Sequence, residues 1–426
     1  MAHDTGYFDA GAPALREIPP CLERLKALRC LVAVVQHGST LRASEAVHLS
    51  QPAVTRSIID LERAFAMPLF ERGGRGMSPT PPGAAAARRA AQLFQHLAKG
   101  AAEALALSPV KGQRPPAPER FASSVSSSSL AAMLAVAASG SESRAARMLG
   151  ASQPSIHRAL RVLEELCGVL LLQKSARGTR LTEGGEAMLL RVKLAVAEAR
   201  ALEAELAAWR GQIRGRVIVG ALPLAATQLL VRAVDEVLRT HPEVEITIVD
   251  GTYESLMRQL RSAEIDLVVG ALRPGVPAGA AQEVLFDEDL VVVCRPGHPC
   301  LGHAALTLGD LHRWRWVLPL PGTPAHAALQ RAFASAGLAL PREAAQATSA
   351  LFTRAFVART DCLTLATRSQ AIEDRVNGQL GIAPVRLSGS ERPIGISTRS
   401  IGEPSPDLMV VVEALRGAAA ARVPGP

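Results

Sequence analysis

The spacing of apolar residues predicts helices in the first half of the chain and alternating strands and helices in the second. From Leu31 to Leu107, and again from Met133 to Arg210, apolar residues recur mainly at helical intervals of three and four. Beyond Gly211 the pattern changes to short apolar runs such as Val217–Ala221, which are separated by helical stretches. Strand–helix alternation of this kind predicts parallel α/β units.

The two helical stretches contain copies of one unit that lie 102 residues apart. Residues 31–83 and 133–185 align without a gap and share 17 identical residues in 53 positions. In the first copy an apolar helix closes at Gly38, a short helix follows, and Ser50 is placed to cap a third helix through its hydroxyl group. A short helix, a tight turn and a capped third helix form a helix-turn-helix. The glycine-rich segment after the third helix predicts a wing in each copy.

Polar residues on the third helix of each copy are suited to contact DNA. They lie away from the apolar stripe of Val54, Ile58 and Leu61, and their side chains can pair with base edges in the major groove. An arginine in each wing is suited to phosphate or to the minor groove. Solvated surface residues would look the same in one copy, but repetition in both copies favours DNA contact. The expected DNA-binding residues are Gln51, Pro52, Thr55, Arg56 and Arg75 in the first copy and Gln153, Pro154, His157, Arg158 and Arg177 in the second.

A long helix without proline or glycine follows the second copy, over Glu186–Arg210. Its apolar residues from Met188 to Trp209 are spaced 4-3-4-3-4-3, which is the spacing of a coiled-coil seam. We expect this helix to dimerise the protein; the alternative is an amphipathic helix that lies on its own domain. The first copy is followed only by Ala84–Leu107, an alanine-rich helix with a weaker seam. The expected dimerisation residues are Val192, Ala199, Leu202, Leu206 and Trp209.

The positive charge of the chain lies with the repeated units. Of the formal net charge of +8, residues 21–108 and 109–210 carry +5 each, residues 1–20 carry −2, and residues 211–426 are neutral. A basic half suits a polyanionic partner such as double-stranded DNA. The neutral half of the chain is expected to have a different role.

Several function classes lack their signatures in the sequence. There is no GxSxG, HExxH, P-loop or strand-following GxGxxG motif, so we expect no enzymatic activity, no catalytic residues and no cofactor. The six cysteines form no CxxC pair and no metal-ligand spacing with histidine, which predicts a reducing compartment and no metal site. Neither a signal peptide nor an apolar run of about 18 residues is visible, so a cytoplasmic location without a membrane partner is expected.

The repeated motifs resemble those of LysR-type transcriptional regulators. The first copy carries Gly-Ser-x-x-Arg-Ala at Gly38–Ala43, Ser-Gln-Pro-Ala-Val-Thr-Arg at Ser50–Arg56 and Pro-Leu-Phe-Glu-Arg at Pro68–Arg72. The second copy carries Ser-Gln-Pro-Ser-Ile at Ser152–Ile156 and the junction Arg-Gly-x-x-Leu-Thr-Glu-x-Gly-Glu at Arg177–Glu186. The resemblance extends over roughly residues 22–416.

This resemblance implies a multidomain chain with two winged helix-turn-helix domains rich in α-helix, a linker helix, and an α/β effector domain of two lobes like periplasmic binding proteins. Members of the family usually carry one DNA-binding domain before a dimerising linker helix, and here the second copy holds that place. We expect both copies to bind DNA; the alternative is that one copy serves assembly only. The expected boundaries are 1–20 for a flexible leader, 21–107 for the first winged domain and its helix, 108–122 for a proline-rich linker, 123–185 for the second winged domain, 186–212 for the dimerising linker helix, 213–288 plus 367–416 for effector lobe I, 289–366 for effector lobe II and 417–426 for a tail.

The resemblance also implies an effector cleft between the two lobes, lined by loops that follow strands. Backbone N–H groups where helices begin suit a carboxylate or phosphate. For Thr323 and Ser349, ordinary helix capping explains the residue equally well. The expected effector-binding residues are Pro223, Leu224, Thr252, Leu272, Pro321, Gly322, Thr323, Thr348 and Ser349.

The expected function is a sequence-specific DNA-binding transcription regulator controlled by a small-molecule effector bound between the lobes. The expected partners are double-stranded DNA, that effector, further copies of the chain in a homodimer or homotetramer, and RNA polymerase. The alternative is a weakly selective basic architectural DNA-binding protein whose C-terminal domain senses nothing.

Overall fold

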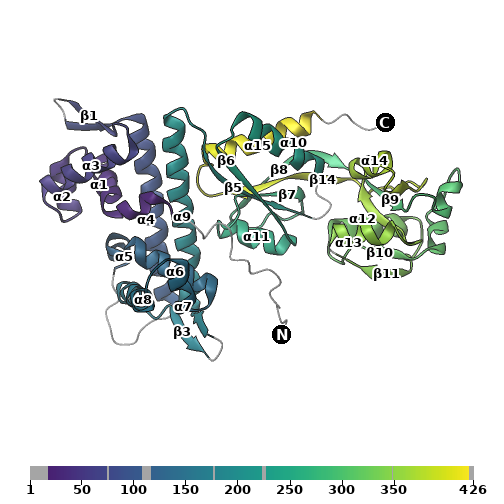
Figure 1. The fold of residues 1–426 in the computed structure, drawn as a ribbon, viewed down its shortest axis with the longest axis horizontal. Helices are drawn as coiled ribbons and strands as arrows, with labels where there is room; N and C mark the ends of the chain where they lie inside the picture. The colour runs from purple at the N-terminus through teal and green to yellow at the C-terminus, as the bar shows by residue number, and fades with distance from the viewer. Residues whose placement is uncertain are drawn as a thin grey trace. The chain divides into compact units, whose positions relative to one another are not determined.

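The computed structural model describes residues 18–73, 76–107, 117–175, 178–222, 227–347 and 349–421 (Figure 1). The chain forms two compact units, which we describe separately. The first takes in the chain up to Gly215 with Ser262–Glu264 and Pro404–Asp407, and the second takes in Arg216–Arg261, Ile265–Glu403 and the residues from Leu408 onward. Most of the expected leader and of the proline-rich linker lies outside the described residues.

The first copy of the repeat folds as three helices, a two-stranded hairpin and a long helix. Gly38 ends the first helix in the left-handed conformation, with φ of 68°, and its N–H donates to the carbonyl of Val34 at 2.8 Å. Ser50 stands at the N-cap of the third helix, but its hydroxyl accepts no capping hydrogen bond, contrary to our expectation. The elements are a 3-10 turn at Pro20–Arg24, α1 Leu25–His37, α2 Thr40–Ala46, α3 Gln51–Phe65, β1 Phe70–Gly73, β2 Gly76–Pro79 and α4 Pro81–Leu107.

The second copy has the same elements, and each begins and ends 102 residues after its counterpart. Its third helix does receive the expected cap, because the hydroxyl of Ser152 accepts from the N–H of Ser155 at 3.3 Å. The elements are α5 Pro118–Ser124, which precedes the repeat, then α6 Ser127–Ser139, α7 Glu142–Met148, α8 Gln153–Cys167, β3 Leu172–Ser175, β4 Gly178–Leu181 and α9 Glu183–Trp209. The two strands of each copy form an antiparallel hairpin, which is the predicted wing.

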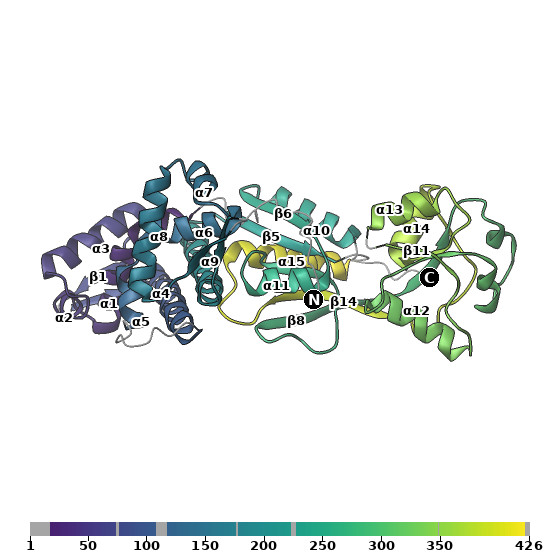
Figure 2. The ribbon, with the colours of Figure 1, turned by 90° about the horizontal axis from the view of Figure 1, so that it is seen from below.

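Helices α4 and α9 lie side by side along their length (Figures 1 and 2). The apolar side chains between them belong to one core that runs through the whole first unit. The seam predicted on α9 is therefore covered by α4 of the same chain, a role that we had assigned to a second chain. Trp209 differs from the rest of the seam, because 52% of its surface is exposed. The buried seam residues of α9 are Met188, Val192, Ala195, Ala199, Leu202 and Leu206.

The second unit contains two lobes, each built on its own sheet. The larger sheet has the strand order β6-β5-β7-β14-β8, and β5 pairs with β7 in parallel. Strand β14 is antiparallel to both β7 and β8, so the sheet is mixed and not purely parallel as predicted. The chain returns from the other lobe to form β14, which explains the reversed direction. The elements are β5 Gly215–Ala221, α10 Thr227–Thr240, β6 Val244–Asp250, α11 Tyr253–Arg261, β7 Leu267–Ala271, β8 Ala280–Glu288, β14 Arg392–Arg399 and α15 Pro406–Ala420.

The smaller lobe is centred on a three-stranded sheet of order β12-β9-β13 and a parallel pair, β10 and β11. We had placed residues 367–416 in lobe I, but Gly381–Ile382 pairs with β9, so the chain stays in lobe II until β14 begins at Arg392. The chain therefore crosses back from lobe II to lobe I just before Arg392. The elements are β9 Leu290–Cys294, 3-10 turns at Pro299–Gly302 and Gly309–Arg313, β10 Trp316–Leu318, α12 Pro324–Ser335, β11 Glu343–Gln346, α13 Ala350–Val357, β12 Thr364–Thr367, α14 Arg368–Val376 and β13 Gly381–Ile382.

Among the described residues, no individual helix has the length and apolar character needed to cross a membrane. The bent pair α5 and α6, with 101° between its helices, meets that test only when the two are taken together.

Candidate DNA-binding and effector sites

The third helix of each copy presents its predicted DNA-binding face to solvent. Val54, Ile58 and Leu61 of α3 are buried in the core, as are the equivalent residues of α8. A buried stripe on one side leaves the opposite side free for a groove of DNA. The predicted residues Gln51, Pro52, Arg56, Gln153, Pro154 and Arg158 are exposed, and Thr55 and His157 are half-buried. Arg75 and Arg177, predicted in the wings, lie outside the described residues.

The two DNA-binding faces differ where the second helix meets the third. In the first copy the side-chain amide of Gln51 donates to the hydroxyl of Thr40 at 3.2 Å. In the second copy Glu142 takes the place of Thr40, and its carboxylate lies 3.3 Å from Nδ1 of His157. The first face is therefore neutral at this point, whereas the second carries a carboxylate beside an imidazole.

Arg56 and Arg158 occupy equivalent exposed positions. Neither forms a hydrogen bond or an ion pair with any residue that the structure describes, so their guanidinium groups are available to a partner. Arginine contacts guanine through two hydrogen bonds and contacts phosphate equally well.

A half-buried carboxylate fixes each wing to its third helix. Glu62 accepts from the N–H groups of Leu69 and Phe70 at 2.9 and 3.3 Å. Glu164 accepts from those of Leu171 and Leu172 at 2.9 and 3.1 Å. Each carboxylate satisfies two N–H groups that the short hairpin leaves without partners. Glu62 and Glu164 therefore hold equivalent wings in the two copies.

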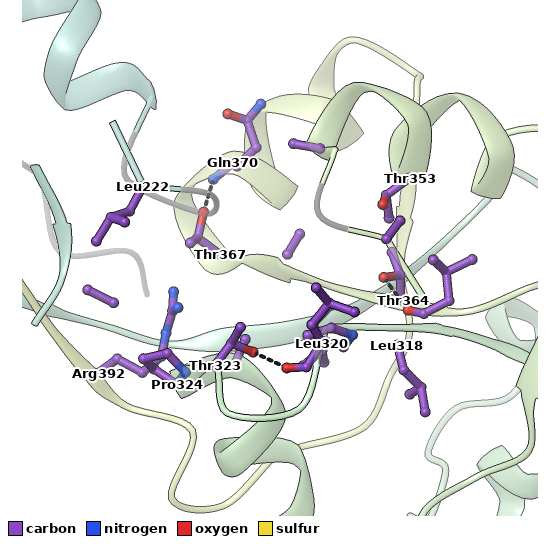
Figure 3. Close-up of a pocket in the computed structure, with 18 of the residues that line it drawn as sticks. Leu222, Leu318, Leu320, Thr323, Pro324, Thr353, Thr364, Thr367, Gln370 and Arg392 are labelled. Atoms are coloured by element: carbon purple, nitrogen blue, oxygen red, sulfur yellow. Dashed lines mark hydrogen bonds between the residues drawn. The ribbon is translucent and has the colours of Figure 1, made fainter. Parts of the chain in front are cut away.

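The second unit contains a cavity of about 330 Å³ that both lobes line (Figure 3). Its wall is mostly apolar, with Leu222 from lobe I and Leu318, Leu320 and Pro324 from lobe II among the residues that line it. A cavity of this size that is mostly apolar and has a few polar groups is typical of a small-molecule site. It lies where the resemblance placed the effector.

Four of the predicted effector-binding residues line this cavity, namely Thr252, Pro321, Gly322 and Thr323. The hydroxyl of Thr323 also caps α12, since it accepts from the N–H of His326 at 3.2 Å. Leu272 and Ser349 are not among the lining residues, and Ser349 instead caps α13. Pro223, Leu224 and Thr348 lie outside the described residues.

The most unusual polar group at the cavity is Arg392, which sequence reasoning missed. The residue is 4% exposed, and its Nε and Nη2 atoms are buried without a hydrogen-bond partner. Burial lowers the pKa of Arg392 to about 10, and the charge of Glu288 on β8 acts in the opposite direction. Figure 3 shows Arg392 with Leu222, Thr323 and Thr367, which line the same cavity.

The other charged residues of the cavity already have partners, although the hydroxyl of Tyr253 and Oδ2 of Asp374 are also buried without a hydrogen-bond partner. Arg273 lies over the ring of Tyr253 at 4.0 Å and pairs with Glu254 at 2.7 Å. One carboxylate oxygen of the buried Asp374 accepts from Arg354 and from Gln370. Arg392 is therefore the cation at this cavity whose hydrogen-bonding capacity is least used.

A cluster of Cys294, His298 and Cys300 lies apart from the cavity, with its potential ligand atoms within 4.8 Å of one another. The ring of His298 is occupied on both sides: Nδ1 accepts from the N–H of Cys300, and Nε2 donates to the carbonyl of Asp361. Burial raises the pKa of the Cys294 thiol well above its usual value. With both ring nitrogen atoms hydrogen-bonded to the backbone, His298 is accounted for as a structural residue of this turn.

Comparisons with known proteins match both halves of the chain. The family described as "Bacterial regulatory helix-turn-helix protein, lysR family" matches residues 25–84 and 128–186, and "LysR substrate binding domain" matches residues 210–420. The chain is 33% identical over 401 residues to the HTH-type transcriptional regulator GalR of Pseudomonas putida, an alignment that covers 93% of this chain and 97% of that protein. It is 30% identical over 278 residues to the HTH-type transcriptional regulator PcaQ of Agrobacterium fabrum, covering 65% and 89%.

Solved structures show the same fold. Full-length OxyR from Pseudomonas aeruginosa matches with a TM-score of 0.53 at 20% identity, over 69% of this chain and 94% of that chain. Full-length CbnR in complex with its target DNA matches with a TM-score of 0.51 at 24% identity, over 68% and 98%. These relatives are transcriptional regulators and not enzymes, in agreement with our expectation. The chain belongs to the LysR family, and it is a DNA-binding transcription regulator with a substrate-binding domain.

Proposed function

We propose that both helix-turn-helix copies bind duplex DNA and that a small anionic molecule in the cavity between the lobes controls that binding. The proposal that both copies bind DNA is supported by one observation: the two copies present the same kinds of residue on their third helices. Both keep an exposed glutamine, proline and arginine on the third helix, above a buried stripe and beside a wing held by a half-buried glutamate. A copy kept only for assembly would not need this set of exposed residues.

Arg56 and Arg158 provide the test of DNA binding. We expect Arg56→Ala and Arg158→Ala each to weaken binding, by roughly 1–3 kcal/mol where the arginine contacts a base. A site would first be selected from a random duplex library with the wild-type chain and then footprinted with each variant at one fixed salt concentration, because phosphate contacts make affinity salt-dependent. Each variant should lose protection over a separate part of the site.

Arg63→Ala is the matched control, because Arg63 also lies on α3 but pairs with Asp60 on an exposed surface near the end of the helix. Its footprint should equal that of the wild type. If only one of the two main variants changes the footprint, the other copy does not bind DNA and the assembly interpretation holds.

The cavity favours an anionic effector because of Arg392. A buried guanidinium group with two unpartnered nitrogen atoms is costly, and a carboxylate would supply the missing acceptors and add to the charge of Glu288. The surrounding wall is largely apolar, so the rest of the molecule is expected to be compact and apolar. A polyhydroxylated or cationic ligand would fit these surroundings poorly.

Matched pairs of ligands test the anionic class. We expect benzoate and hexanoate to raise the melting temperature of the wild-type chain more than benzamide and hexanamide do at equal concentration. Arg392→Gln should weaken carboxylate binding by about 10- to 100-fold, since a hydrogen bond to a charged group contributes roughly 1.5–3 kcal/mol. Binding would be measured by calorimetric titration.

Arg273→Gln is the control, because Arg273 lines the same cavity but is already paired with Glu254. It should change carboxylate affinity much less than Arg392→Gln. Equal binding of amides and carboxylates would contradict the role of Arg392. A bound carboxylate that leaves DNA affinity unchanged would instead favour a non-sensing architectural protein.

A further inference from the structure

We propose that one chain contains, in the pairing of α4 with α9, the two-fold arrangement of DNA-binding domains that otherwise requires two chains. A single chain would then contact two unlike half-sites. The DNA-binding part of this proposal rests on the proposed function of both copies. The pairing itself rests on three features of the helix pair.

The first feature is an ion-pair pattern with two-fold symmetry. Arg89 of α4 donates from Nε to Glu205 of α9 at 3.0 Å. Arg191 of α9 donates from Nε to Glu103 of α4 at 2.8 Å. Arg191 is the repeat equivalent of Arg89, and Glu205 is that of Glu103, each 102 residues later. The same arginine–glutamate pair therefore occurs twice, once in each direction across the two helices. An interface in which each contact recurs with the partners exchanged is isologous, as in a two-fold homodimer.

The second feature is the complementary size of the side chains along the seam. The ion pairs make the helices antiparallel and set their register, so the small residues at the ends of the α4 seam face the larger residues of α9. The α4 residue Gly100 shows how close the fit is: a Cβ built there would lie 2.8 Å from Sδ of Met188. In chain order, the seam of α4 is Ala86, Ala90, Leu93, Leu97, Gly100 and Ala104, and that of α9 is Met188, Val192, Ala195, Ala199, Leu202 and Leu206.

This complementarity selects α4 with α9 over either helix with itself. In an antiparallel α9–α9 pair the large end residues would meet one another, and the two central alanines would leave space. In an antiparallel α4–α4 pair the small end residues would leave space, and the two central leucines would meet one another. Overpacking and cavities both destabilise a core, so unlike helices pack best.

The third feature is the charge around Arg89. This side chain is 2% exposed, and it contacts Glu198 at 3.2 Å as well as Glu205. The repeat equivalent of Glu198 is His96 on α4, so an α4–α4 pair would replace that carboxylate with an imidazole. A buried arginine needs its carboxylates, and only α9 supplies both.

A second chain cannot use the same seam while α4 covers it. The two DNA-binding faces also differ, with Thr40 and Thr55 in one copy and Glu142 and His157 in the other. We therefore expect the selected DNA site to consist of two half-sites that are not identical. The GalR relative aligns over 93% of this chain, so its alignment also spans both copies.

A disulfide tests whether the pair forms within one chain. The Cβ built on Gly100 would lie 2.9 Å from Cβ of Arg191, so the two helices must separate by about 1 Å to reach the roughly 3.8 Å of a disulfide. Full-length chains carrying Gly100→Cys and Arg191→Cys together would be oxidised and compared with each single variant on a non-reducing gel. We expect a linked species of monomer mass in the double variant alone, at all protein concentrations.

Tagged and untagged chains would also be mixed before oxidation, to detect disulfides that join two different chains. Linked species that contain both kinds of chain would overturn the proposal, because the helices would then be exchanged between chains. If the double variant folds poorly, Glu103→Arg with Arg191→Glu provides a second test. Glu103→Arg alone should lower the melting temperature, the double exchange should restore it, and failure of the exchange to restore it would also overturn the proposal.

DNA binding by the linked chain separates this proposal from the function on which it rests. We expect the oxidised chain to bind its selected site within about threefold of the reduced wild type. Loss of binding on oxidation alone would show that the internal pair is not the arrangement that binds DNA. An internal disulfide in a chain that binds no DNA in either state would leave the helix pair intact but refute the proposed function. A perfectly palindromic selected site would contradict the prediction of unlike half-sites.

Discussion

Arg89→Ala is expected to lower the free energy of unfolding of the helical unit by about 3–5 kcal/mol, the range for breaking a buried ion pair from one side. Arg89 lies 2% exposed between Glu198 and Glu205, which are themselves only 12% and 18% exposed. Burial alone would lower the pKa of Arg89, but the hydrogen bonds and charges of these glutamates raise it above its usual value. Removing the guanidinium group takes the shared cation away from both carboxylates, although Glu205 keeps its pair with Arg88 at 2.9 Å.

Urea denaturation followed by circular dichroism would measure this loss. Arg63→Ala is the control, since its pair with Asp60 is exposed on both sides and should contribute at most about 1 kcal/mol. Arg89→Lys provides a variant with a milder effect, because one ammonium group cannot hold both carboxylates as a guanidinium group does. A loss from Arg89→Ala no larger than that from Arg63→Ala would show that the two carboxylates are solvated in the folded chain.

The helical unit was largely predictable from sequence, with one important exception. The repeat, its helices and its wings depend on local signals such as Gly38 and the glycine-rich segment after the third helix, and these appear at the same places in both copies. The partner of the α9 seam was not predictable in the same way. Periodicity shows that an apolar face exists, but it does not show what covers it. The complementary face of α4 was hard to recognise in the sequence because it consists mostly of alanine and glycine, which contribute little to an apolar pattern.

The effector cavity was predictable only in part, because its residues come together through sheet pairing. Thr252, Gly322 and Thr323 follow strands, and that position in a loop was visible in the sequence. Arg392 begins a strand that pairs with β8 at Glu288, more than 100 residues earlier in the chain. Nothing around Arg392 in the sequence distinguishes it from an exposed arginine. Its burial follows from the crossing between the lobes, which was also the boundary that we misplaced.

Gly83→Ala and Gly185→Ala are expected to destabilise the junction between each wing and its long helix. Both glycines lie in the first turn of a helix, where alanine would ordinarily be more stable by about 1 kcal/mol. Here, however, a Cβ at Gly83 would lie 1.9 Å from the carbonyl oxygen of Leu69, and a Cβ at Gly185 would lie 2.0 Å from that of Leu171. These oxygens belong to the backbone and cannot rotate away, so the wing or the helix must move.

The same glycines donate their N–H groups to Thr80 and Thr182 at 3.1 and 3.0 Å, and each threonine hydroxyl in turn donates to a backbone carbonyl just before the wing. Movement at the glycine therefore also breaks the cap that joins wing to helix. We expect each substitution to cost at least about 2 kcal/mol, within the upper part of the range for single substitutions. Gly417→Ala on α15 is the control, since nothing lies within 4 Å of its added Cβ and a neutral or stabilising effect is expected.

Hydrogen exchange would show where each loss occurs. Gly83→Ala should increase exchange in β1 and β2, and Gly185→Ala should increase it in β3 and β4, because each clash is confined to its own copy. Footprints should follow the same division, with each variant losing the half-site of the copy that it perturbs. Equal losses in both copies from either substitution would show instead that the continuous core makes the two copies unfold as one, and that the half-sites cannot be lost separately.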